Sequence, residues 1–193
     1  MPRRIVLALI AAAFAFALPF AATAQALDPA RSRIDFDLQT RWGQTISGRF
    51  PRYDGEVVQR ADGRHEVHIR LATAAVDVEG SRRYTRFARG ENFLDAAHHP
   101  WVEFRSEPYP PELLASGGWL YGTLTMHGIS RREAFLVAPA ACARPAHDCD
   151  VVAQGRVLRT DYGVESWRWA LTDDVSFRLR VRVLDTPPSV SAP

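Results

Sequence analysis

Hydrophobic and polar residues alternate with a period of two along most of the chain from Ser32 onward. The clearest run, near the C-terminus, places on one side Val175, Phe177, Leu179, Val181 and Val183. Shorter runs of the same kind cover residues 34–38, 67–71, 102–104, 120–126 and 151–157. Successive side chains of a β-strand point to opposite faces, so this pattern predicts strands with one apolar and one solvent-facing side.

Turn-forming residues separate these runs. The turn signals are Tyr53-Asp54-Gly55, Ala61-Asp62-Gly63, Ser116-Gly117-Gly118, His127-Gly128 and Thr172-Asp173-Asp174. Their spacing predicts about eight antiparallel strands in an all-β fold. Open sheet edges favour aggregation, and closure of the sheet removes them. We therefore expect an eight-stranded closed barrel, whose interior is filled by side chains or holds one small ligand.

Residues 81–92 depart from the period of two and predict a short helix near one mouth of the barrel. Tyr84, Phe87 and Ala88 lie at helical spacing. The same segment carries the arginines Arg82, Arg83, Arg86 and Arg89. Guanidinium groups bind phosphate and carboxylate well, so these arginines are candidates for contact with the head group of a ligand. The alternative is a solvated helix face without a binding role.

The first 24 residues have the pattern of a cleaved signal peptide. Arg3 and Arg4 precede an apolar run that ends near Phe20, and small residues follow it. A retained membrane anchor is the competing interpretation, but the run is shorter than the roughly 20 residues that a spanning helix needs. We expect cleavage after Ala24 or Ala26, export, and a single domain over residues 25–193.

Export changes the interpretation of the two cysteines, Cys142 and Cys149. Six residues separate them, and in an oxidising compartment such a pair predicts a disulfide that closes a loop between two strands. A metal site that includes His147 is the competing interpretation, and it lacks further ligands nearby in the sequence.

Composition and charge exclude several classes of function. The 193 residues are 47% hydrophobic, which is too apolar for a disordered chain. All 24 basic residues are arginine, so lysine Schiff-base chemistry and the P-loop signature are excluded. Without Arg3 and Arg4, 22 basic residues balance 22 acidic ones, and this neutral body predicts no binding to nucleic acid.

The sequence presents no clear catalytic or metal-binding constellation, and we expect neither an enzyme nor a cofactor. The nucleophile-elbow pattern G-x-S-x-G is absent. His98 and His99 lie close to Asp95 and could bind a metal, but a role in the turn before Pro100 is the simpler interpretation. Asp173 and Asp174 are expected to bond their own backbone in a turn.

One arginine falls on the apolar side of its predicted strand. A buried Arg159 needs a partner, and we expect a structural ion pair.

Several short motifs, in their order and spacing, resemble the YceI-like family of periplasmic polyisoprenoid-binding proteins. They are SRIDF at 32–36, GRF at 48–50 with Gly55, FLD at 93–95, HPWVEF at 99–104, GTLTMHG at 122–128, GRVLRTDYG at 155–163 and DDV at 173–175. The resemblance implies a lipocalin-like barrel in the periplasm with an elongated cavity. It also implies a ligand with a long apolar tail: a polyisoprenoid, an isoprenoid quinone or a fatty-acid-like molecule.

Combined with the alternation, the resemblance gives a set of candidate ligand-binding residues. They are Phe36, Leu38, Phe50, Val67, Ile69, Phe104, Leu124, Met126, Phe135, Val157, Phe177 and Leu179. Alternation does not separate cavity-lining residues from plain core. A transient contact with the inner membrane or a membrane protein, and a homodimer, are further expectations. Two other hypotheses stay open: an accessory protein or enzyme of a membrane redox system, and a stress-related barrel with a solid interior.

Overall fold

The structure, a computed structural model, describes residues 23–185, which form one antiparallel sheet with few helices. Its strands are β1 (Thr23–Ala26), β2 (Arg33–Thr40), β3 (Thr45–Arg49), β4 (Tyr53–Gln59), β5 (His65–Ala72), β6 (Asp77–Val78), β7 (Trp101–Ser106), β8 (Gly118–Met126), β9 (Ile129–Val137), β10 (Val151–Leu158) and β11 (Leu171–Val181). The helical elements are α1 (Arg82–Arg89), α2 (Glu112–Ser116) and the 3₁₀ turns η1 (Thr73–Ala75) and η2 (Arg159–Tyr162). The predicted signal peptide lies outside the described residues except for Thr23 and Ala24, which belong to β1.

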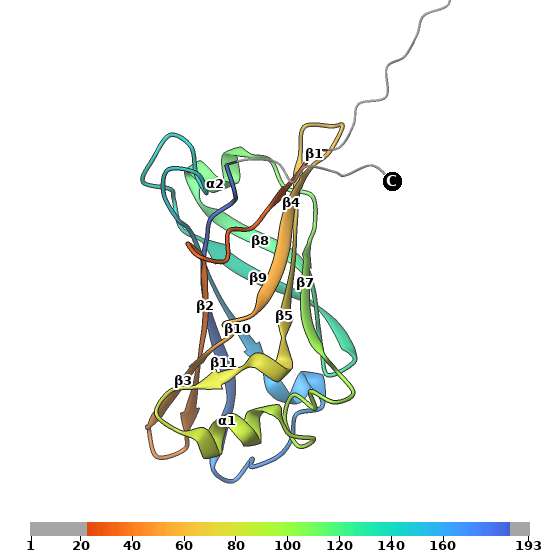
Figure 1. Ribbon diagram of the computed structural model, residues 1–193, viewed down its shortest axis with the longest axis vertical. Coiled ribbons are helices and arrows are strands. Elements are labelled where there is room, and N and C mark those ends of the chain that lie inside the picture. Colours follow the sequence, from red (N-terminus) through yellow and green to blue (C-terminus); the bar gives the residue numbers. More distant parts are fainter. Residues whose placement is uncertain (1–22, 186–193) are drawn as a thin grey trace, which may run out of the picture.

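The sheet curls into a half-barrel (Figure 1) with strand order β1-β4-β5-β7-β8-β9-β10-β11-β2-β3-β6. The prediction of eight strands in a closed barrel is therefore wrong in strand number and in closure. The edge strands β1 and β6 have four and two residues, too few for a visible alternation in the sequence. No ladder pairs β1 with β6 within residues 23–185. Instead, a single bridge between Leu27 and Val183 brings the chain after β1 beside the chain after β11.

The inward faces of the long strands carry the core, as the alternation predicts. Val67, Ile69 and Leu71 of β5 are buried, and so is Phe177 of β11. Large rings fit because glycines on neighbouring strands leave space beneath them. A Cβ atom at Gly155 would lie 2.5 Å from the ring of Phe135. Glycine at this position therefore lets the ring lie flat against the wall of the barrel.

The predicted short helix is confirmed as α1, which lies across one end of the curled sheet (Figure 1). Its N-terminus is capped by Ser81, whose Oγ accepts a hydrogen bond from the backbone N–H of Tyr84 at 3.1 Å. At the last turn, the Arg89 guanidinium donates two hydrogen bonds to the carbonyl of Val76. These bonds fix the helix against the chain that precedes it. Within residues 23–185, no helix has the length and apolarity needed to span a membrane.

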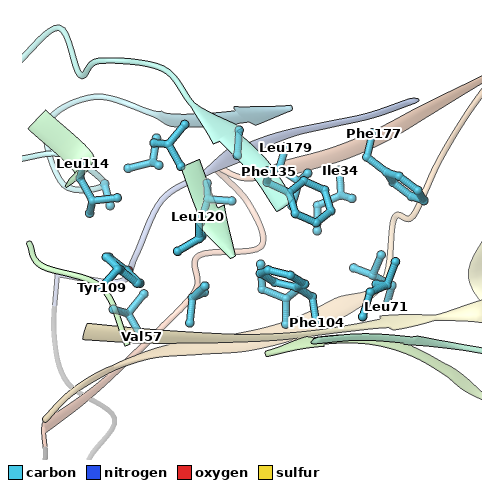
Figure 2. A pocket seen from close by; sticks show the side chains of 18 of the residues that line it. Ile34, Val57, Leu71, Phe104, Tyr109, Leu114, Leu120, Phe135, Phe177 and Leu179 are labelled. Carbon is cyan, nitrogen blue, oxygen red and sulfur yellow. The ribbon is translucent and has the colours of Figure 1, made fainter. Parts of the chain in front are cut away.

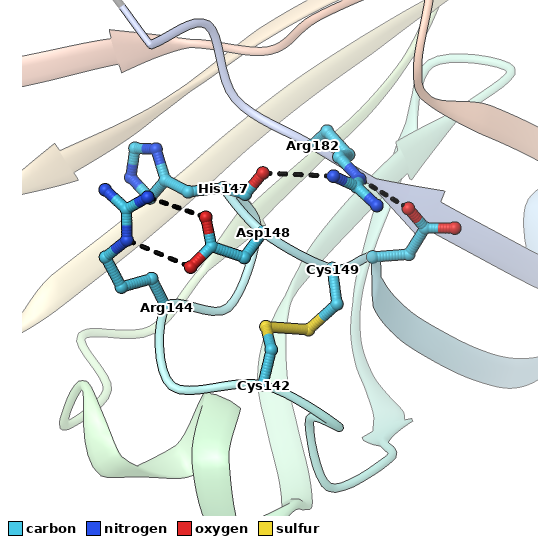
Figure 3. Close-up of a disulfide and its surroundings, with 7 residues drawn as sticks. Cys142, Arg144, His147, Asp148, Cys149 and Arg182 are labelled. Atoms are coloured by element: carbon cyan, nitrogen blue, oxygen red, sulfur yellow. Dashed lines mark hydrogen bonds and ion pairs between the residues drawn. A yellow bond between two sulfur atoms is a disulfide. The ribbon is translucent and has the colours of Figure 1, made fainter.

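The predicted disulfide is also confirmed, and it closes the loop between β9 and β10 (Figure 3). Arg144 and Asp148 form an ion pair inside the loop at 2.6 Å. Arg182 attaches the loop to the end of the sheet, because its guanidinium bonds Asp150 at 2.6 Å and the carbonyl of His147 at 3.0 Å. The loop lies at the end of the half-barrel opposite α1 (Figure 1).

Two turn predictions are wrong. Tyr53, Asp54 and Gly55 lie within β4 and pair with β5. Thr172, Asp173 and Asp174 lie within β11, at an irregularity between Leu171 and Val175 in its pairing with β2. The side chain of Asp173 accepts hydrogen bonds from the N–H and Oγ1 of Thr160, not from its own backbone. The acidic pair resembles a turn in sequence, but Asp174 pairs with Leu158 of β10 and Thr160 holds Asp173, so the strand continues through it.

Candidate functional site

The end of the half-barrel far from α1 encloses a cavity of about 90 Å³, here called the inner cavity (Figure 2). Every side chain in its wall is hydrocarbon or aromatic, and the phenol of Tyr109 is the one polar group among them. Seven of the predicted binding residues line it: Val67, Ile69, Phe104, Leu124, Phe135, Phe177 and Leu179. Burial raises the pKa of Tyr109 to about 12, so the phenol stays neutral at physiological pH. The inner cavity therefore offers no charge to a ligand.

A second cavity of about 240 Å³, the mouth cavity, lies beneath α1. Its wall includes four further predicted residues, Phe36, Leu38, Phe50 and Met126. The apolar face of α1 closes it from outside with Tyr84, Phe87 and Ala88. The helix forms in this place because Ser81 starts it and because its face toward the sheet is apolar. An amphipathic helix thus covers one side of the mouth cavity.

Phe177 belongs to the walls of both cavities. Its ring lies 6.5 Å from the ring of Phe36, which lies 5.6 Å from the ring of Phe50. Figure 2 shows Phe177 at one end of the inner cavity, beside Ile34 and on the side opposite Leu71. Phe177 alone borders both cavities, so its ring forms the wall between them. The interior is therefore two adjoining chambers, not one smooth tube.

The mouth cavity is bordered by a group of exposed rings, here called the aromatic rim: Trp42, Tyr84, Phe87, Trp167 and Trp169. Ring centroids lie 6.2 Å apart for Trp42 and Trp169, and 5.7 Å apart for Trp167 and Trp169. The ring of Phe87 lies 5.7 Å from that of Trp167. Trp42 and Trp169 are 67% and 69% exposed, so the rim presents large apolar surfaces to solvent.

Trp167 and Trp169 have the spacing of one face of a strand, but neither residue belongs to a strand. They lie on the loop between η2 and β11. Arg159 holds this loop, since its buried guanidinium donates to the carbonyls of Val164, Ser166 and Thr172 at 2.6 to 3.0 Å. The expected ion pair of Arg159 is absent from the described part of the chain, and carbonyls replace it. Burial lowers the pKa of Arg159 from its ordinary value.

The remaining predicted binding residues lie elsewhere. Val157 is 2% exposed and borders neither cavity, so it belongs to the plain core. Arg82, Arg83 and Arg86 are exposed on α1 and form no ion pair with any residue in the range 23–185. Arg83 lies over the ring of Phe87 at 5.3 Å, while Arg89 is held by the carbonyl of Val76. Three of the four arginines therefore have no acidic partner in the described chain, and none of the four lines either cavity.

A comparison with models of known protein families agrees with the sequence motifs and with this geometry. The model of the YceI-like domain matches residues 25–183. The chain belongs to the YceI-like family. No curated protein matches the sequence of this YceI-like chain.

Solved structures show the same YceI-like fold at low identity. BcnA from Burkholderia cenocepacia is 19% identical with a TM-score of 0.65, over 80% of this chain and 98% of that one. A polyisoprenoid binding domain from Saccharophagus degradans is 14% identical with a TM-score of 0.61, over 83% of this chain and 97% of that one. The YCEI protein of Campylobacter jejuni is 17% identical with a TM-score of 0.54, over 72% and 85%.

Proposed function

We propose that this YceI-like protein is a periplasmic binding protein that carries a lipid with a long apolar tail. The tail would be that of a polyisoprenoid, an isoprenoid quinone or a fatty-acid-like molecule. The two adjoining cavities inside the half-barrel are the observation that carries the proposal, because apolar side chains make up nearly all of their walls. The Saccharophagus degradans neighbour, described as a polyisoprenoid binding domain, supports the same class of ligand.

The energetics favour long tails over compact solutes. Each buried methylene contributes about 0.8 kcal/mol, so ten of them contribute about 8 kcal/mol before the costs of association. A polar solute would lose its hydrogen bonds to water and find almost no partners in these walls. Affinity in such a site therefore grows with the length of the apolar tail.

A binding role also fits the chemistry of the walls better than catalysis does. Arg159 is the one charged side chain that lines either cavity among the described residues. Three of its five N–H donors are already used by backbone carbonyls. The protein on this proposal needs no cofactor, and the lipid is its ligand.

The head group of the lipid would lie at the mouth cavity. Arg82, Arg83 and Arg86 lie on the helix that covers this cavity, without acidic partners among residues 23–185, and guanidinium groups bind phosphate or carboxylate. The same end would contact the inner membrane when lipid is exchanged. Exposed tryptophans favour the membrane–water interface, and nearby arginines are attracted to anionic lipids.

Native mass spectrometry of protein released gently from its host tests the proposal, with the bound molecule identified by fragmentation. The expected result is a lipid adduct. Leu124→Arg places a charge in the inner cavity and should abolish the adduct. Leu136→Arg is the matched control, because Leu136 is 46% exposed on the neighbouring strand β9 and should keep it. Repeated recovery of empty protein without affinity for prenols or quinones would refute the proposal.

The membrane contact has a separate test with vesicles that contain phosphatidylglycerol. Exchange of Trp42 and Trp169 for serine should lower binding to these vesicles. Trp119→Ser is the matched control, since Trp119 is 55% exposed on β8, outside the aromatic rim. Equal binding of both variants would show that the rim does not face the membrane.

A further inference from the structure

Outside the two cavities, the fold brings together three side chains that can bind a metal. Asp95, His99 and His127 each offer one ligand atom, and these atoms all lie within 4.8 Å of one another. All three residues are half-buried. The rings of His99 and His127 are 4.8 Å apart between centroids. Two imidazoles and a carboxylate are a donor set that late transition metals prefer.

The turn after α1 places Asp95 and His99 side by side. The carbonyl of Asp95 accepts hydrogen bonds from the N–H groups of His98 and His99, at 3.0 and 2.8 Å. This compact turn, in which Asp95 has a positive φ of 41°, leaves the ligand atoms of Asp95 and His99 within 4.8 Å of each other. The Oγ1 of Thr73, which is 1% exposed, donates to the carbonyl of His99 at 2.7 Å and fixes this end of the turn.

His127 reaches the same point from the hairpin between β8 and β9. The loop has two residues, since Met126 pairs with Ile129, and both His127 and Gly128 have positive φ. Such a loop prefers asparagine, aspartate or glycine at its first position, and histidine is among the residues that adopt a positive φ more readily than most. Gly128 leaves room for the neighbouring imidazole, because a Cβ atom on it would lie 2.9 Å from Cε1 of His99.

Hydrogen bonds to neighbouring groups fix the tautomer of His127 and the orientation of Asp95, as such bonds do for the ligands of metal sites. The Nδ1 of His127 lies 3.2 Å from the carbonyl of Tyr162, and a carbonyl can only accept. Nδ1 therefore donates, which leaves the lone pair of Nε2 free for a metal. His98 bonds both carboxylate oxygens of Asp95 through its Nδ1, at 3.0 and 2.8 Å, and orients that group.

We propose that Asp95, His99 and His127 form a binding site for a divalent transition metal of the zinc class, independent of the lipid cavity. In a tetrahedral zinc site the ligands, about 2.1 Å from the metal, lie roughly 3.4 Å apart. Small side-chain rotations bring the three groups to that spacing. The remaining coordination position would hold water. A bound ion would tie the turn after α1 to the β8–β9 hairpin.

Isothermal titration of tag-free, chelator-treated protein with Zn²⁺ tests the proposal. We expect one ion per chain, and a rise in the melting temperature with Zn²⁺. Both His127→Ala and His99→Ala should weaken Zn²⁺ binding about tenfold or more. Co²⁺ should give a visible absorption band in the unaltered protein and not in either variant.

His68→Ala is the matched control, because His68 lies 3.8 Å from Glu103 on the outer face of the sheet and has a carboxylate neighbour. It should leave Zn²⁺ affinity unchanged. Circular dichroism without metal shows whether each variant is folded. If His127→Ala does not fold, His127→Asn replaces it, because asparagine is favoured at this position of the hairpin loop. Absence of Zn²⁺ binding in the unaltered protein would overturn the proposal. Equal affinity in folded variants of His99 and His127 would overturn it as well.

Discussion

At the scale of single residues, Phe177 decides the shape of the interior. It is the one described side chain that both cavities share, and its ring contacts Phe36 across the partition. Phe177→Ala should join the two chambers, so the preferred tail becomes longer by several methylenes. The loss of a buried ring should also lower the free energy of unfolding by about 3–5 kcal/mol. Denaturant unfolding and binding of a homologous series of amphiphiles measure both effects.

Phe50→Ala is the control for that experiment. Phe50 lines the mouth cavity alone, so its loss enlarges one chamber without removing the shared wall. A variant of Phe177 with the same preferred tail length as the unaltered protein would show that the partition does not limit the ligand.

The burial of His65 predicts that the stability of the protein depends on pH. Burial lowers its pKa below 6.5, and its Nδ1 is buried without a hydrogen-bond partner among the described residues. The unfolded chain then binds more protons than the folded one, so stability falls as the pH drops through 6.5 toward the lower folded pKa. His65→Leu should flatten the change in melting temperature between about pH 7.5 and 5.5.

His68→Leu, on the opposite face of the same strand β5, is the comparison for His65→Leu. If both variants follow the pH profile of the unaltered protein, burial of His65 does not set the dependence.

At the scale of elements, the β9–β10 loop depends on its disulfide. Cys142 and Cys149 are seven positions apart, a short loop whose closure contributes about 2–3 kcal/mol in the chain-entropy model. Exchange of both cysteines for serine should lower the free energy of unfolding by that amount. A reducing agent should destabilise the unaltered protein equally and leave the double variant unchanged. A reductant effect on the double variant would contradict this account.

Some elements can be predicted from the sequence and others cannot. Long strands with one buried face were visible, because each carries several inward residues at a period of two, as β5 and β11 do. The two-residue strand β6 has no period to detect, and it exists because β3 supplies its hydrogen-bonding partner. The acidic pair in β11 has the composition of a turn, and nothing in the local sequence reveals the bonds from Thr160 to Asp173 or the register shift against β2.

At the scale of the whole molecule, the two chambers predict a dependence on tail length. Each added methylene should raise affinity about fourfold until the chambers are full, because 0.8 kcal/mol corresponds to that ratio. Beyond that length the affinity should level off. Competition titration with alkyl or prenyl amphiphiles that share one head group measures the series. Constant affinity along the series would mean that tails do not enter the interior.

The sequence by itself determined the all-β class, the helix at the mouth, the disulfide and the apolar inward faces. Each of these follows from local spacing: a period of two, a period near four, or a short distance between cysteines. Tertiary structure alone decided the open half-barrel, the partition by Phe177, the aromatic rim and the meeting of Asp95, His99 and His127. These features join residues from distant segments, and only the strand order and the packing of side chains bring such residues together.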